Sequence, residues 1–146
     1  MRRVSVLLVV LLMVVAAPAS AVTDWGTRAK AATGRVADTY ASSNLGWTEA
    51  SVGRTVNKVD GARVRVRTTD GVAAKVDVSA FIMCANGSSK DESLTLTTKA
   101  DSAWSYVTLY KPADKKRGQC LFDGSVDDWY GKVASPLEIQ LQTTSY

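Results

Sequence analysis

Apolar residues recur at every second position over much of the chain from Trp47 onward, and Asp-Gly or Asn-Gly pairs divide the first half of this region into segments. A period of two is typical of β-strands that bury one face. Asp-Gly and Asn-Gly are the strongest short-range signals of a hairpin turn, because glycine adopts a positive φ without steric cost. Asp60-Gly61, Asp70-Gly71 and Asn86-Gly87 therefore predict a succession of short antiparallel strands.

The register of each hairpin follows from the side chains, because the apolar residues of both strands must share one face. A two-residue loop at the second pair places Val66 opposite Lys75, whereas a three-residue loop over Thr69–Gly71 pairs small apolar residues with each other. We therefore expect the three-residue loop, with Gly71 left-handed, and the same loop type over Val59–Gly61. The expected pairs are Val64 with Val76, Val66 with Ala74, and Val56 with Val64.

Further strands are expected at Leu94–Thr98, Ala103–Tyr110, about Gln119–Asp123 and Leu137–Thr143. In the last of these, leucine and isoleucine alternate with glutamate and glutamine, a pattern typical of a sheet with one buried and one hydrated face. The chain is thus expected to be mainly β, an antiparallel meander of about seven short strands. Because a single-layer sheet cannot bury both faces, these strands must form a sandwich or pack on an N-terminal helix.

A helix is expected over about residues 24–43, because apolar residues there recur at steps of three and four. Gly26 and Gly34 weaken this prediction, and a hairpin that turns at Thr33-Gly34 is the competing interpretation. The residues on the apolar face of the helix would be Trp25, Ala29, Ala32, Val36 and Tyr40.

Residues 1–21 have the features of a cleavable secretory signal peptide. Arg2 and Arg3 precede an apolar run over residues 4–15 that is too short to span a bilayer, and Ala19-Ser20-Ala21 fits the A-x-A cleavage pattern. We therefore expect a single secreted domain over residues 22–146. A retained membrane anchor is the alternative interpretation.

Cleavage would lower the count of Lys and Arg from 18 to 16 against 14 acidic residues, which leaves a net charge of only +2. Nucleic acid is therefore not an expected partner, since it normally requires a concentrated cationic surface. Cys84 and Cys120 are the two cysteines of the chain. An even number in an exported protein favours a disulfide, with two thiols or an intermolecular bond as alternatives.

The chain has no histidine, which removes the usual general base and the commonest transition-metal ligand. No cofactor or metal is expected, and no catalytic residue is assigned. Asp123, Ser125 and Asp127 resemble the start of a calcium loop, but Asp128 and Ala134 replace the glycine and the glutamate that such a loop requires. We interpret this segment as a polar turn.

Arg63, Arg65 and Arg67 alternate along one strand and therefore project from one face of it. In the expected register Arg65 lies opposite Lys75, and Arg63 lies opposite Asp77. The four basic residues are a candidate binding face for an anionic envelope polymer. An ordinary solvated sheet face is the alternative interpretation.

Trp104, Tyr106 and Tyr110 share one face of a strand whose other face carries Val107 and Leu109. They are either covered by the helix or a second sheet, or form an exposed platform of the kind that stacks on sugar rings. The strand that ends at Cys84 is also apolar on both faces, through Phe81, Ile82 and Met83. Two such strands favour burial under the helix.

The favoured function is that of a non-catalytic secreted binding protein, which acts at or outside the cell envelope on a polysaccharide or a secreted protein. A small inhibitor of an extracellular enzyme is the first alternative, with Asn86–Glu92 or Lys111–Gly118 as the contact loop. An envelope hydrolase that uses two carboxylates is the second.

Overall fold

The computed structural model describes residues 24–32, 48–112, 115–128, 130 and 135–146, which form two antiparallel four-stranded sheets. Sheet A has the strand order β1-β8-β3-β6, and sheet B has the order β2-β7-β4-β5. Residues 1–21, the expected signal peptide, and residues 33–43 of the expected helix lie outside the described residues. The strands are β1 Gly26–Ala32, β2 Thr48–Val56, β3 Val59–Thr68, β4 Lys75–Cys84, β5 Ser89–Thr97, β6 Ser105–Tyr110, β7 Cys120–Asp128 and β8 Leu137–Ser145.

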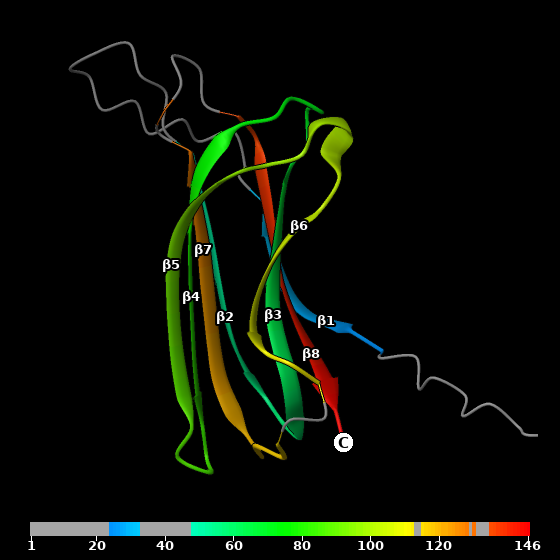
Figure 1. The fold of residues 1–146 in the computed structure, drawn as a ribbon, viewed down its shortest axis with the longest axis vertical. Coiled ribbons are helices and arrows are strands. Elements are labelled where there is room, and N and C mark those ends of the chain that lie inside the picture. Colours follow the sequence, from blue (N-terminus) through cyan, green and yellow to red (C-terminus); the bar gives the residue numbers. More distant parts are fainter. Residues whose placement is uncertain (1–23, 33–47, 113–114, 129, 131–134) are drawn as a thin grey trace, which may run out of the picture.

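The mainly-β, antiparallel architecture is confirmed, and of the two expected arrangements the structure adopts the sandwich. Figure 1 shows the two layers, with β5, β4, β7 and β2 in one and β3, β6, β8 and β1 in the other. The chain changes layers at most of its connections. Among the described strands, only β4 and β5 are neighbours both in sequence and in a sheet, and they turn at Asn86-Gly87 with Gly87 at φ 85°.

The hairpin registers expected at Thr69–Gly71 and Val59–Gly61 are wrong. β3 pairs with β6 and β8, whereas β4 pairs with β5 and β7, so the turn after β3 leads into the opposite sheet. Gly71 does adopt the expected left-handed conformation, with φ 76°. The valines of β3 and β4 face the same core from opposite layers, and this arrangement satisfies the alternation as well as a hairpin does.

The turn between β2 and β3 also lies elsewhere than expected. Lys58 has a φ of 54°, and the segment Val59–Gly61 is already the start of β3. The expected contacts of Arg65 with Lys75 and of Arg63 with Asp77 fail with these registers, because β3 and β4 belong to different sheets.

The expected helix is wrong over Gly26–Ala32, which form the edge strand β1 and pair with β8. A bulge between Thr27 and Ala29 shifts the register, after which Ala29 and Ala31 pack against the core. The small residues of this segment carry little apolar surface for a helix to bury, whereas β8 offers a full row of backbone partners. Pairing at the sheet edge therefore outweighs the local periodicity.

The core between the sheets is dominated by valine, isoleucine, leucine and phenylalanine side chains with almost no exposed surface. Gly124 of β7 leaves room for two core side chains, because a Cβ atom at this position would lie 3.0 Å from Leu141 Cδ2 and 3.2 Å from Ile139 Cδ1, a crowded contact. The expected disulfide is confirmed between Cys84 and Cys120, which are cross-strand neighbours on β4 and β7. In the part of the chain that the structure describes, no helix is long and apolar enough to cross a membrane.

Candidate functional site

The strand registers align the outward side chains of sheet B in rows that cross all four strands. Small side chains fill the middle row and larger ones stand on both sides, which creates a trough across the sheet about 14 Å long. The rows are a serine row of Ser51, Ser125, Ser79 and Ser93, an acidic row of Glu49, Asp127, Asp77 and Thr95, and an aromatic row of Gly53, Asp123, Phe81 and Asp91. We call the serine row with its two flanking rows the serine trough.

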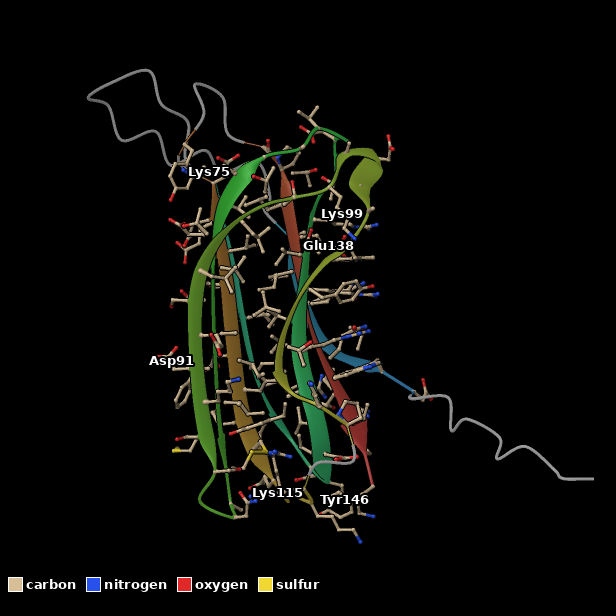
Figure 2. The ribbon with its side chains drawn as sticks, viewed as in Figure 1. Lys75, Asp91, Lys99, Lys115, Glu138 and Tyr146 are labelled. Atoms are coloured by element: carbon tan, nitrogen blue, oxygen red, sulfur yellow. A yellow bond between two sulfur atoms is a disulfide. The ribbon has the colours of Figure 1, made fainter. Side chains whose placement is uncertain are left out.

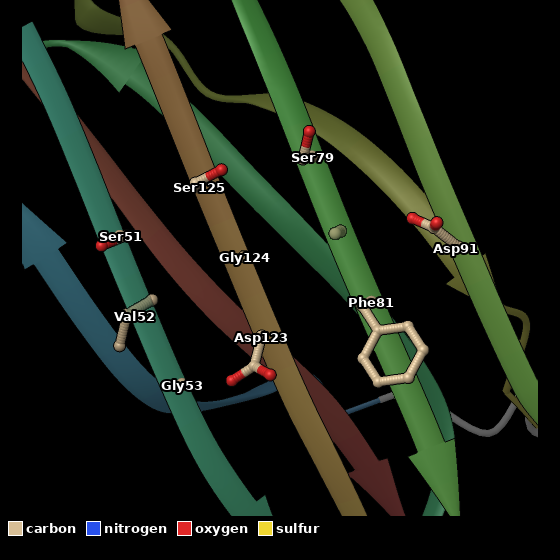
Figure 3. Close-up of a pocket in the computed structure, with 10 residues that line it drawn as sticks. Ser51, Val52, Gly53, Ser79, Phe81, Asp91, Asp123, Gly124 and Ser125 are labelled. Atoms are coloured by element: carbon tan, nitrogen blue, oxygen red, sulfur yellow. The ribbon is translucent and has the colours of Figure 1, made fainter.

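A groove of about 390 Å³ lies along the serine trough and includes Ser79, Ser125 and Phe81 in its lining. Figure 3 shows the Phe81 ring on β4, with Asp123 and Asp91 on the strands to either side. The Phe81 side chain is 36% exposed. The site thus combines an accessible aromatic ring with hydroxyl groups, which donate and accept hydrogen bonds, and carboxylates, which accept them.

Asp123 lies at the edge of the groove, opposite a residue that has no side chain. Gly53 is its cross-strand partner on β2, and a Cβ atom at Gly53 would collide with the Asp123 carboxylate. The carboxylate therefore lies over the glycine, across the gap between the two strands (Figure 3). On the other side of the serine row, Asp77 accepts hydrogen bonds from the Tyr130 hydroxyl at 2.8 and 2.9 Å.

Asp127, near the middle of the acidic row, has a raised pKa. Burial raises the pKa of Asp127, and the neighbouring carboxylates of Glu49 and Asp77 raise it further. The Asp127 Oδ1 atom is buried and has no hydrogen-bond partner among the described residues. The ionised form of the Asp127 side chain is therefore disfavoured in the folded protein relative to the unfolded chain.

Replacement of this residue, Asp127→Asn, is expected to raise the melting temperature at neutral pH. A raised pKa in the folded state means that ionised Asp127 destabilises the fold above that pKa, and the amide removes the charge. The advantage of the variant should shrink as the pH falls through the Asp127 pKa, because the wild-type carboxyl group then becomes neutral too. Thermal unfolding at neutral and acid pH checks this, with the exposed Asp91→Asn as the control. A variant that is no more stable at neutral pH would contradict the assignment.

The outer face of sheet A carries a stack of alternating guanidinium groups and aromatic rings, which we call the arginine ladder. Its members are Arg63, Arg65, Arg67, Trp25, Trp104 and Tyr106. The Arg63 guanidinium lies 4.1 Å from the ring centre of Trp25 and 4.4 Å from that of Tyr106. Trp104 has Arg65 at 4.2 Å and Arg67 at 4.4 Å. Because outward residues two apart on a strand are separated by roughly 7 Å, the two arginines lie on opposite faces of the Trp104 ring.

A polar row on β8 holds the three arginines of the ladder in position, one partner for each. Gln142 Oε1 accepts a hydrogen bond from Arg63 Nε at 2.9 Å, and Gln140 Oε1 accepts from Arg65 Nε at 3.0 Å and Nη2 at 2.6 Å. Glu138 forms an ion pair with Arg67 at 2.6 Å. Figure 2 shows side chains projecting from this side of the sandwich, where Glu138 is labelled.

The electrostatics of the ladder reflect its partial burial. Burial lowers the pKa of Arg63, and the charge of Arg65 lowers it further, against an opposing effect of Tyr106. Burial by itself raises the pKa of Glu138, but hydrogen bonds from Gln140 and Arg67 and the charges of Arg67 and Lys30 outweigh it and lower the pKa. The carboxylate at this end of the ladder is thus stabilised in its charged form.

The structure brings together five of the seven residues proposed as a binding face and separates the other two. Arg63, Arg65, Arg67, Trp104 and Tyr106 belong to the ladder. Tyr110 pairs with Ala62 beyond a bulge at Leu109 of β6, and its ring packs against Arg117 at 3.6 Å at the end of the sandwich. Lys75 lies on sheet B, where its Nζ atom is 4.5 Å from the ring centre of Tyr130.

Among the residues that the structure describes, no α-helix covers the two strands that carry these aromatic side chains. Trp104 and Tyr106 lie on the outer face of sheet A, and the Tyr106 side chain is 46% exposed. Phe81 and Met83, also expected to be buried, are exposed on the outer face of sheet B. Each strand still buries its alternate residues, since the second sheet covers one face of each.

Sequence reasoning missed the serine trough. Asp123, Ser125 and Asp127, interpreted as a polar turn, are instead the outward residues of β7. The sequence signal for this strand was the alternation of these polar residues with Phe122, Gly124 and Val126. The residues with which they align across the sheet depend on registers that join segments about 70 and 45 residues apart in the chain, such as Ser51↔Ser125 and Ser79↔Ser125.

No protein-family model and no curated protein matches the chain. Solved structures similar to it include TmCBM61 in complex with beta-1,4-galactotriose, with 12% identity, a TM-score of 0.37, and coverage of 68% of this chain and 62% of that one. A CBM4 structure has 9% identity, a TM-score of 0.36, and coverage of 69% and 71%. The C-terminal family 22 carbohydrate binding module of Clostridium thermocellum Xyn10B has 13% identity, a TM-score of 0.30, and coverage of 85% and 86%. All three TM-scores are below 0.5, so we interpret the trough and the ladder from their own geometry.

Proposed function

We propose that this protein is a non-catalytic carbohydrate-binding protein that holds a neutral glycan chain in the serine trough. The observation that carries the proposal is the aromatic row, in which the exposed Phe81 ring lies between the carboxylates of Asp123 and Asp91 and beside a floor of serines. A trough that crosses four strands fits an extended ligand better than a compact one.

The chemistry of the trough matches a sugar chain in two respects. The apolar face of a pyranose ring can stack on Phe81, as apolar groups do on an accessible aromatic ring. Sugar hydroxyls can donate to Asp123 and Asp91, and both donate to and accept from the serine hydroxyls. The acidic row and the two aspartates make this face electronegative, which disfavours acidic sugars.

Two features support a location outside the cytoplasm. The Cys84–Cys120 disulfide requires oxidising conditions to form and persist. Residues 1–21 carry the pattern of a secretory signal peptide. We infer that the glycan is a component of the cell envelope or of the surroundings.

The test is a binding screen of the full chain, with its disulfide formed, against neutral oligosaccharides, followed by calorimetry. Phe81→Ala should weaken binding of the best ligand roughly tenfold, equivalent to about 1.4 kcal/mol, because the stacking surface is lost. Its stability should fall by about 1 kcal/mol, less than for a core aromatic residue, because Phe81 is on the outer face of the sheet and 36% exposed.

Met83→Ala is the matched control, because Met83 is an exposed apolar residue two positions further along the same strand and outside the groove. Its binding should equal that of the wild type. Failure of every neutral glycan to bind, or unchanged binding by Phe81→Ala, would remove the proposal. Release of new reducing ends from a bound glycan would instead indicate a hydrolase, with Asp91 and Asp123 as the first carboxylates to replace.

A further inference from the structure

The basic face of sheet A extends from the arginine ladder onto the edge strand β1. Lys30 is the cross-strand neighbour of Gln140, which in turn is the neighbour of Arg65. A cavity of about 650 Å³ lies beside them, at the bulge of β1. Four cations line it, with no carboxylate among the lining residues, which are Thr27, Arg28, Ala29, Lys30, Arg54, Arg65 and Gln140.

The three arginines among these cations donate their hydrogen bonds to neutral groups. Arg28 donates from Nε to Thr143 Oγ1 at 2.9 Å, and Arg54 donates from Nη1 to the carbonyl oxygen of Arg28 at 2.8 Å. Arg65 donates to the amide oxygen of Gln140. Within the described residues, no carboxylate forms an ion pair with any of these three arginines, with Lys30 or with Arg63. The arginines are therefore oriented without a direct ion pair, while the charge of Lys30 is partly balanced by the nearby Glu138.

Guanidinium groups lie over every ring of the ladder, which leaves less ring surface for stacking on a ligand. Guanidinium groups cover both sides of Trp104, and Arg63 lies over Tyr106. A ligand on this face is thus recognised mainly by charge and hydrogen bonds. This feature separates the ladder from single-strand nucleic-acid sites, which rely on open aromatic faces.

The spacing of the ladder indicates the shape of the ligand. Arg63, Arg65 and Arg67 repeat along β3 at roughly 7 Å, and Lys30, opposite Gln140 on β1, continues the charge sideways. The ion pair of Glu138 with Arg67 shows how a carboxylate binds at one end, with Oε2 accepting from Nε at 2.8 Å and from Nη2 at 2.6 Å. A row of planar, charged donors suits a repeated carboxylate.

We propose that the basic face of sheet A, formed by the arginine ladder and the cavity at β1, is a second binding site, which takes a linear polysaccharide with carboxylates on its sugar units. The site is separate from the serine trough, because the arginine ladder and Lys30 lie on sheet A; only Arg54 comes from sheet B, where it donates to the Arg28 carbonyl oxygen at the sheet edge. The protein then binds a neutral chain on one face and an acidic chain on the other, and can link the two.

The test measures binding of the full, oxidised chain to alginate, whose sugars each carry a carboxylate, with neutral dextran as the comparison polymer. Alginate should bind, and its affinity should fall steeply as salt is raised, because binding displaces counterions. Lys30→Gln should weaken binding severalfold, and Lys30→Gln with Arg65→Gln should weaken it more than tenfold and flatten the salt dependence.

Lys115→Gln is the control of equal charge, since Lys115 is exposed and is labelled at the far end of the molecule from Glu138 in Figure 2. Lys30 is exposed on an edge strand, so its single variant reports on binding even if the loss of Arg65 disturbs the ladder. Alginate binding that is absent, or equal in wild type and Lys30→Gln, would overturn the proposal. Tighter binding of a single-stranded oligonucleotide than of alginate would overturn it in favour of nucleic acid. Phe81→Ala should leave alginate binding unchanged, so the two sites can fail separately.

Discussion

Joint replacement of Cys84 and Cys120 by alanine is expected to lower the free energy of unfolding by about 4 kcal/mol, on the chain-entropy treatment of a disulfide. The bond closes a loop with a sequence separation of 36 residues, and its removal restores the conformational freedom of that loop to the unfolded chain. Such a loss is a large fraction of the stability of a domain of this size. Urea-induced unfolding of the variant and the wild type measures it.

Reduction of the wild-type protein provides the control, because it opens the loop while both sulfur atoms stay in place. Cys84 and Cys120 are buried, so the alanine variant also loses some packing. Reduced wild type should therefore lie between the oxidised protein and the variant. Equal stability of reduced and oxidised wild type would show that closure of the loop contributes nothing.

The sequence predicted the positions of most strands, but it did not predict which strands pair with each other. Alternation and Asn86-Gly87 predicted strands and one true hairpin, since both signals are local. Asp70-Gly71 predicted a turn correctly but not the layer to which it leads. The alternating valines cannot separate a hairpin from a crossover, because both arrangements bury the same side chains.

The N-terminal strand β1 shows a different limit. Trp25 and Ala29 satisfy a helical period, and nothing local in the segment reveals that the edge of β8 is open to pair with it. The side chain of Trp25 then finds its contact on Arg63 rather than on a core under a helix. Tertiary pairing decides the structure of such a short, weakly apolar segment.

The two candidate sites differ in how far the sequence could predict them. The arginines of the ladder follow from alternation within one strand, so Arg63, Arg65 and Arg67 could be placed on one face in advance. The serine trough requires the order of β2, β7, β4 and β5, which no local pattern specifies. Sites assembled by long-range strand order are hidden from single-sequence reasoning even when every strand is recognised.

Arg117 illustrates the same limit in a loop. It lies in Lys111–Gly118, a segment expected to be an exposed contact loop, yet its side chain is only 2% exposed. Its Nη1 atom donates to the carbonyl oxygens of Asp60 at 2.7 Å and Lys115 at 2.9 Å, and its guanidinium lies 3.6 Å from the ring centre of Tyr110. The side chain therefore joins the loop to the start of β3 and closes one end of the sandwich.

Arg117→Ala is expected to lower the free energy of unfolding by about 3 to 5 kcal/mol, because it leaves a cavity under Tyr110 and removes the donor to two carbonyl groups. Arg117→Met separates these contributions, since it fills most of the volume but donates no hydrogen bond. It should recover part of the loss. Lys116→Ala changes the exposed neighbour, whose Nζ atom lies 5.1 Å from the ring centre of Tyr146, and should cost less than about 0.5 kcal/mol. Full stability of Arg117→Ala would mean that the loop closes the sandwich without this side chain, and urea-induced unfolding of the three variants decides between these outcomes.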